Sequence, residues 1–181
     1  TLKENKAESY TNTFRGRPGQ VYKLTVKTGG QTYTAASVMP NAVSLDSVGV
    51  SAISVGKKSV KTVSAFYRDP DDEQNQYRFM LYVNGVQVKD IFTVNDYLTN
   101  GRYVNTTLYQ DDIPLKAGDK VDVEMQCIDP NVYNYFYNLS HQGGNSPNNS
   151  ATPTNPTSNV SNGALGYFSA FTVQHKSIIV L

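Results

Sequence analysis

The sequence predicts an all-β protein: an antiparallel β-sandwich, immunoglobulin-like or jelly-roll-like, with one short helix near residues 130–140 and a long ordered polar loop over 142–163. The 181-residue chain contains 13 tyrosines, and tyrosine, valine and threonine favour the pleated, half-buried surfaces of sheets. About ten short segments of alternating apolar and polar residues are separated by turn signals at close spacing, which is typical of a sandwich or barrel. There is no internal repeat and no strand–helix–strand rhythm, so a doubly wound parallel sheet is not expected.

Composition narrows the possible functions. Hydrophobic residues make up 39% of the chain, which is enough for a core, and the formal net charge of +1 gives no steering toward nucleic acid or an anionic membrane. One cysteine, Cys127, excludes an internal disulfide and a multi-cysteine metal site. No apolar run approaches the roughly 20 residues that span a bilayer. The first residues lack a signal peptide's apolar core and an initiator Met, so we expect a mature or trimmed fragment.

The first predicted element is a β-hairpin. Pro18 and Gly19 favour a type II turn, because proline presets the backbone at one position and glycine accepts positive φ at the next. Val21–Val26 then alternates between two faces, and Gly29 with Gly30 closes the hairpin onto a returning strand, 31–38.

The central strands follow from the same alternation. Asn84 and Gly85 are the strongest hairpin signal in the chain, because a type I′ turn needs positive φ at two consecutive positions. Cys127 falls on the apolar side of the last of these strands, so we interpret it as a small core residue and not as a reactive thiol. The predicted strands cover residues 43–55, 60–67, 77–83, 86–92, 103–109 and 121–127.

One helix is expected after these strands. Asp129 is a good N-cap and Pro130 suits the first helical position. Val132, Phe136 and Leu139 then share one helical face, which predicts a helix lying on an end or face of the sandwich.

The polar stretch from residue 142 to 163 has the composition of a linker. Only about eighteen residues follow it, too few to fold alone, so the final strands must insert into the sheets formed earlier. We therefore expect 155–163 to pack on the domain with its Asn side chains capping turns. We also expect strands over 167–173 and 176–181, with Tyr167, Phe168 and Phe171 buried.

A charged loop between two predicted strands offers a weak calcium candidate. Hard cations bind several oxygens from one loop, although the spacing here is not that of an EF-hand. A solvated turn is the alternative. The candidate ligands are Asp69, Asp71, Asp72 and Glu73.

No catalytic signature is present, so we expect a protein that is not an enzyme and has no cofactor. The two histidines, His141 and His175, lie near no Gly-x-Ser-x-Gly elbow and do not have the spacing of a metal site. Glycosylation sequons occur at Asn105, Asn138, Asn148 and Asn159, as expected by chance in a chain rich in Asn and Thr.

Tyrosines on the helix are weak ligand-binding candidates: Tyr133, Tyr135 and Tyr137. Exposed aromatic rings often stack on sugars, which makes a carbohydrate-binding or adhesin-type surface module the alternative function. The same residues serve equally well to fill the half-buried edges of a sheet.

Four stretches together resemble a known family. They are 14–26 with 30–35 and Met39-Pro40, 67–77 (YRDPDDEQNQY), the Gly118-Asp119 turn with the strand and helix after it, and 155–171 (NPTSNVSNGALGYFSAF). The last is the most specific. The chain resembles the Bacteroidetes envelope proteins classed as domain-of-unknown-function family 4249.

This resemblance covers nearly the whole chain and implies a lipoprotein of the cell envelope, anchored in the outer membrane. Because the family's genes often lie beside TonB-dependent receptors, it implies an accessory of such an uptake system, with the receptor as partner and membrane contact only through a lipid anchor absent from this sequence. It also implies that residues 1–40 are the remnant or edge hairpin of an N-terminal immunoglobulin-like region. Residues 41–181 would then be the main β-sandwich. The family has no catalytic residues to carry over.

Overall fold

The computed structural model describes residues 2–6, 9–142 and 155–181. Within these residues the chain is mostly β, with four antiparallel sheets and one helix, so the predicted all-β class is confirmed. Residues 143–154 of the predicted polar loop lie outside the described residues. No helix in the described part is long and apolar enough to cross a membrane.

One half of the sandwich is a five-stranded sheet. Its strand order is β12-β11-β7-β8, and β9 pairs with β7 as well. The predicted type I′ turn joins β7 to β8, with φ of 50° at Asn84 and 81° at Gly85. The strands are β7 (Gln76–Val83), β8 (Val86–Gln87), β9 (Phe92–Asn95), β11 (Lys120–Cys127) and β12 (Thr172–Ile179).

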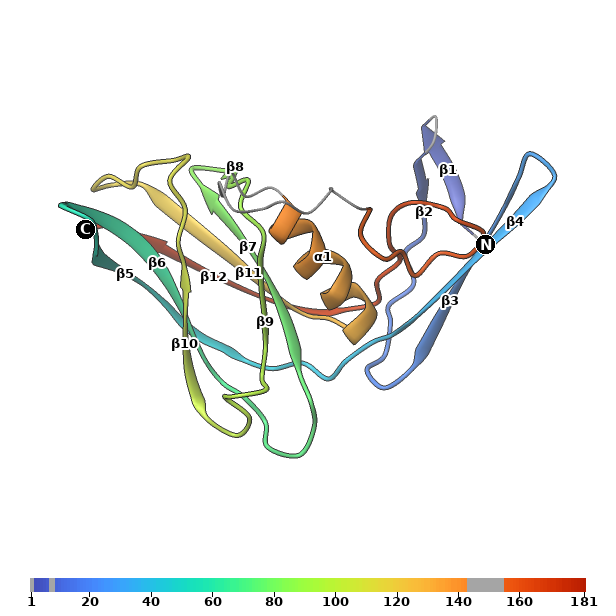
Figure 1. Ribbon diagram of the computed structural model, residues 1–181, viewed down its shortest axis with the longest axis horizontal. Helices are drawn as coiled ribbons and strands as arrows, with labels where there is room; N and C mark the ends of the chain where they lie inside the picture. The colour runs from blue at the N-terminus through green and yellow to red at the C-terminus, as the bar shows by residue number, and fades with distance from the viewer. Residues whose placement is uncertain (1, 7–8, 143–154) are drawn as a thin grey trace.

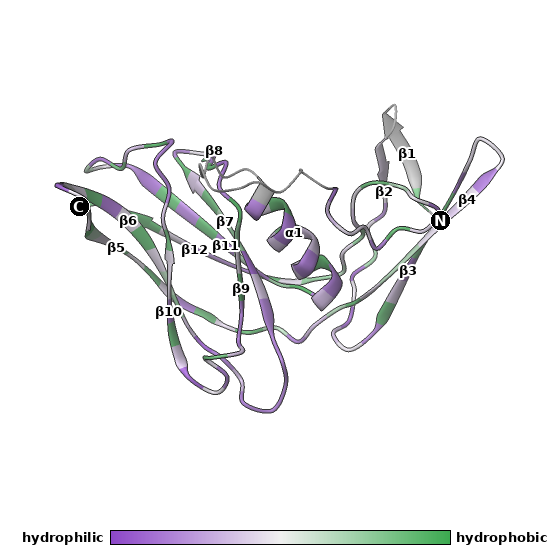
Figure 2. Cartoon of the chain, viewed as in Figure 1, coloured by the Kyte–Doolittle hydropathy of each residue, from purple (hydrophilic) through white to green (hydrophobic). Residues whose placement is uncertain are grey.

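The other half is a three-stranded sheet in the order β10-β6-β5, formed by Tyr103–Leu108, Lys58–Arg68 and Leu45–Val55. The core lies between the two sheets. It takes every second residue of β7 and β11, and hydrophobic and polar residues alternate along these strands (Figure 2). Cys127 is buried in this core, where it accepts a hydrogen bond from the Val43 amide and burial raises its pKa. The core interpretation of Cys127 is therefore confirmed.

Two hairpins lie at the opposite end of the molecule from the C-terminus (Figure 1). The strands β1 (Lys3–Lys6) and β2 (Ser9–Thr11) form one, where no strand is predicted. The strands β3 (Val21–Thr28) and β4 (Gln31–Val38) form the other, and only this second hairpin is predicted, with bounds close to those found. Each hairpin is a two-stranded sheet separate from the sandwich. The division of the chain at residue 40 remains a prediction.

The single helix, α1 (Pro130–Gln142), begins where the sequence predicts. One carboxylate oxygen of Asp129 caps it by accepting hydrogen bonds from the Asn131 and Val132 amides, at 2.9 and 3.1 Å. The helix lies on the outer face of the five-stranded sheet, where the Arg78 guanidinium of β7 sits 3.8 Å from the centre of the Phe136 ring. This placement supports the expectation of a helix covering a face of the sandwich.

The described end of the polar loop, 155–163, packs against β4 as predicted. Val160 forms a β-bridge with Ala35, and the Asn162 side chain donates to the Thr32 carbonyl at 2.7 Å. The Asn159 side chain caps the turn that follows, since its oxygen accepts from the Phe168 amide and its nitrogen donates to the Phe168 carbonyl.

The expectation of a buried strand over 167–173 is wrong. A single strand, β12, replaces the two expected, and it starts only at Thr172. Leu165 is 72% exposed, Tyr167 41% and Phe171 37%. The backbone before β12 bonds to side chains instead of a neighbouring strand: Phe168 to Asn159, and the Ala170 amide to Ser37.

Candidate functional site

The acidic loop between β6 and β7 contains one deeply buried carboxyl. Asp69 is 1% exposed, and one of its oxygens accepts a hydrogen bond from the Tyr77 hydroxyl. The other oxygen, Oδ2, is buried with no hydrogen-bond partner. Burial raises the pKa of the Asp69 carboxyl and outweighs the lowering effect of the Tyr77 bond, and the carboxylates of Asp96 and Glu73 raise it further.

Sequence reasoning missed Asp96, which belongs to the turn between β9 and β10. Asp96 is buried, accepts from the Asn75 amide at 2.7 Å, and donates its own amide to the Asn75 carbonyl. The Asp69 amide donates to the Arg102 carbonyl, so the two loops are tied together. Asp96 lies more than twenty residues from the acidic cluster, and only the pairing of β7 with β9 brings it close.

The four calcium candidates have different surroundings. Asp69 and Asp71 line one pocket of about 270 Å³ together with Arg68, Pro70 and Gly101. Asp72 is exposed, and both carboxylate oxygens of Glu73 lie 3.2 Å from the Asn41 side-chain nitrogen. In the described part of the chain, no three His, Cys, Asp or Glu side chains are grouped to hold a metal ion. Calcium binding stays a prediction.

Two of the three helical tyrosines belong to a stacked column along α1. The rings of Tyr133 and Tyr137 have centroids 5.7 Å apart at an angle of 30°, and the His141 ring follows at 4.2 Å. The spacing of four residues explains the column, because such residues are neighbours on a helix surface. Tyr133 is half-buried, whereas Tyr137 is 43% exposed.

Tyr135 lies in a different cluster. Its ring meets Phe136 edge-on at 5.5 Å and Tyr167 at 5.1 Å, and Tyr167 also contacts Phe136 at 4.7 Å. Arg78 lies on the Phe136 ring. This cluster fastens the segment before β12 to the helix, so Tyr135 has a structural role that the sequence pattern did not separate from its neighbours.

Hydrogen bonds through Asn95 connect the turn after β9 to the column. The Asn95 side chain donates to the Tyr133 hydroxyl at 3.1 Å and accepts from the Tyr97 amide at 3.3 Å. Tyr97 and Leu98 are 83% and 77% exposed. We call Tyr97, Tyr133, Tyr137 and His141 the tyrosine surface. A turn sequence does not show that the Tyr97 backbone is linked through Asn95 to a distant helix, because that link depends on the fold.

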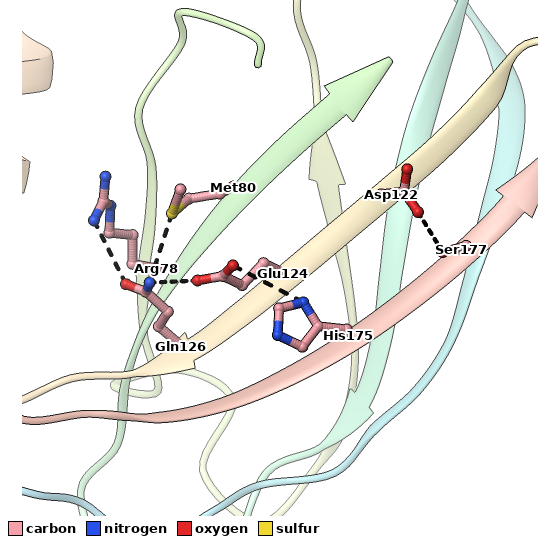
Figure 3. A network of polar contacts seen from close by, with 7 residues as sticks. All are labelled: Arg78, Met80, Asp122, Glu124, Gln126, His175 and Ser177. Carbon is pink, nitrogen blue, oxygen red and sulfur yellow. Dashed lines mark hydrogen bonds and ion pairs between the residues drawn. The ribbon is translucent and has the colours of Figure 1, made fainter. Parts of the chain in front are cut away.

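A polar network covers the outer face of β7, β11 and β12 (Figure 3). Gln126 contacts Arg78 at 3.5 Å and Glu124 at 2.5 Å, and His175 Nδ1 lies 3.9 Å from a carboxylate oxygen of Glu124. Ser177 donates to Asp122 farther along the sheet. The His175 side chain is 66% exposed, so in this structure it is a surface residue beside Glu124.

Comparison with known proteins identifies the family. A family model described as "Domain of unknown function (DUF4249)" matches residues 1–177. The chain belongs to the DUF4249 family. No curated protein and no solved structure matches it significantly. The DUF4249 match includes the hairpins, the sandwich and the helix, so the tyrosine surface lies within the family's own domain.

Proposed function

We propose that this DUF4249 protein is a non-catalytic binding component of the cell envelope, accessory to a TonB-dependent outer-membrane uptake system. The tyrosine surface carries this proposal. It is a preorganised contact area, in which Asn95 ties the Tyr97 turn to Tyr133 and His141 Nδ1 lies 2.7 Å from the Tyr137 carbonyl.

The geometry favours a protein partner. Tyrosine is enriched in protein interfaces, where it supplies apolar contact area and a hydroxyl at low entropic cost. A sugar needs a free ring face to stack on, whereas Tyr137 lies between Tyr133 and His141. The exposed side chains of Tyr97 and Tyr137 offer apolar area together with hydroxyl groups, which suit the mixed apolar and polar surface of a protein.

The proposed partner is a TonB-dependent outer-membrane receptor, in an organism of the Bacteroidetes. Membership in the DUF4249 family supports this choice through the envelope setting that the sequence resemblance implies. The protein would be held at the outer membrane by a lipid anchor outside this sequence and would touch the membrane only through it.

A pull-down from native envelope tests the proposal. Wild-type protein should recover a TonB-dependent receptor, and a Tyr97→Ala, Tyr137→Ala double variant should recover at least about tenfold less, as expected when two interface anchors are truncated. Tyr103→Ala is the matched control, because Tyr103 is 58% exposed on β10, in the other sheet. Recovery of no receptor by the wild type, or equal recovery by all three proteins, would contradict the proposal.

One observation favours the alternative, a carbohydrate-binding or adhesin-type module. Tyr97 is 83% exposed, which leaves its ring open to a sugar. A glycan array distinguishes the two functions: glycan binding that Tyr97→Ala abolishes and Tyr137→Ala preserves would favour the carbohydrate function.

A further inference from the structure

The β3–β4 hairpin, at the end of the molecule opposite the C-terminus (Figure 1), has two outer edges, and the structure covers one of them. The Ser161 amide donates to the Thr34 carbonyl at 2.8 Å. The Asn162 side chain donates to the Thr32 carbonyl at 2.7 Å. The segment 159–162 therefore occupies the outer edge of β4. In the described part of the chain no strand other than β4 pairs with β3, so the outer edge of β3 is open.

The register shows which backbone groups lie on this open edge. In an antiparallel pair, two residues opposite each other either exchange backbone hydrogen bonds or turn their N–H and C=O groups away from each other. Thr32 and Thr34 turn theirs away from β3, so their partners Lys27 and Thr25 turn theirs toward the open edge, and the alternation adds Lys23. All three residues of β3 are exposed. Within residues 2–6, 9–142 and 155–181, no protein group bonds to these backbone groups.

Strand β3 has few of the features that protect an edge strand from pairing. Its register with β4 runs through eight residue pairs without a bulge, and no proline interrupts it. Its lysines are the exception, because lysine on an edge discourages pairing between copies. In an antiparallel pair of two chains centred on Thr25, Lys23 of one copy would lie opposite Lys27 of the other, and like charges in that position are destabilising. The edge therefore disfavours a second copy of this chain and suits a strand with acidic side chains.

The two faces of β3 specify the other side chains of such a strand. Lys23 and Lys27 share one face, and no described carboxylate lies within ion-pair distance of either lysine. Leu24 and Val26 share the opposite face, where Val26 is 42% exposed. A strand with acidic residues at alternate positions and apolar residues between them would place carboxylates beside the lysines and apolar side chains beside Leu24 and Val26.

A pocket next to Lys23 adds a second contact for an acidic side chain. It has a volume of about 570 Å³, and its lining includes Lys23, Thr25 and Thr34 but no acidic residue. Sheet edges that bind peptides draw affinity from main-chain hydrogen bonds and specificity from pockets that take alternate side chains. A carboxylate in this pocket would have a cation and hydroxyl groups as neighbours.

We propose that the open edge of β3 binds an extended segment of a partner protein, which joins the hairpin as a third strand. The segment carries acidic side chains at alternate positions, facing Lys23 and Lys27, and apolar side chains between them. This edge and the tyrosine surface lie on different elements, so the two proposals are tested separately.

Titration with two synthetic peptides of eight residues, the length of β3, tests the proposal. One peptide alternates glutamate with valine, the other alternates lysine with valine, and both have neutral ends. The glutamate peptide should bind and, at saturation, slow hydrogen exchange at the amides of Lys23, Thr25 and Lys27 by at least about tenfold. The lysine peptide should leave exchange at these amides unchanged.

A charge reversal locates the contact. The Lys23→Glu, Lys27→Glu double variant should bind the glutamate peptide at least about tenfold more weakly and should gain binding of the lysine peptide. Lys57→Glu, Lys176→Glu is the control, because it makes the same change in net charge at exposed lysines outside the hairpin, and it should bind the glutamate peptide as the wild type does.

Four results would overturn the proposal. They are no binding of the glutamate peptide by the wild type, binding that leaves the three amides unprotected, equal binding by the two double variants, and protection of these amides in a dimer of the wild type.

Discussion

Two tyrosines are buried side by side in the core, and the hydroxyl group of each forms a hydrogen bond. The rings of Tyr67 and Tyr77 have centroids 4.9 Å apart, and the Tyr67 hydroxyl pairs with Thr106 at 3.2 Å while that of Tyr77 bonds to Asp69. Burial raises the pKa of Tyr67 to about 12 and raises that of Tyr77 as well. Ionising either residue would place a negative charge in an apolar core.

The alkaline stability of the fold should depend on these residues. Because the pKa of Tyr67 is raised in the folded state, its contribution is fully present below the unfolded pKa of about 10 and is lost as pH rises toward 12. The Tyr67→Phe variant keeps the aromatic ring but loses the hydrogen bond of the hydroxyl, which should lower the free energy of unfolding at pH 8 by about 1 kcal/mol. We expect its free energy of unfolding to fall less than that of the wild type between pH 8 and pH 11.

Urea unfolding at the two pH values measures this difference, and exposed Tyr97→Phe is the control that should behave as the wild type does. An equal loss in all three proteins would show that Tyr67 is not responsible.

At the scale of helices and strands, the sequence predicts the elements that are marked by a pattern of neighbouring residues. Strand β7 alternates between buried and half-buried residues along its length, and the N-cap of α1 lies next to the helix it caps. The segment 167–171 was mispredicted because its backbone partners are side chains elsewhere: Asn159, and Ser37 at a separation of 133 residues. The candidate site follows the same rule, since the Tyr133–Tyr137 column is a helical repeat whereas its link to Tyr97 depends on the fold.

Removing the Asn159 side chain should release the segment 167–171. In the Asn159→Ala variant, the Phe168 amide and carbonyl lose the partners that replace a strand. We expect a loss of about 1–3 kcal/mol in the free energy of unfolding and faster hydrogen exchange at the Phe168 amide. Asn155→Ala, an exposed residue of the same loop, is the control. Unchanged protection of Phe168 would contradict this account of the segment.

At the scale of the whole molecule, a buried joint connects the β3–β4 hairpin to the sandwich. The Ser37 hydroxyl donates to Asp129, the N-cap of α1, and accepts from the Ala170 amide at 2.8 Å. Ser37, Asp129 and Ala170 are each at most 8% exposed. Three distant parts of the chain are therefore joined in one buried hydrogen-bond network. No local sequence pattern reveals this network. It opposes motion of the hairpin relative to the sandwich.

The hairpin and the sandwich should consequently unfold together. The hairpin has few buried residues of its own, and β4 is joined by the Val160 bridge and by the Asn162–Thr32 hydrogen bond to a segment that continues into β12. Breaking the sandwich removes Asp129, Ala170 and this bridge at once, so the hairpin loses its support in the same step.

The chain has no tryptophan, so Phe14→Trp, at an exposed residue stacked on Tyr22, reports on the hairpin alone. Tryptophan fluorescence and far-ultraviolet circular dichroism should give the same urea midpoint. A fluorescence midpoint clearly below the dichroism midpoint would show that the joint does not couple them, and Ser37→Ala should then leave the separation between the two midpoints unchanged.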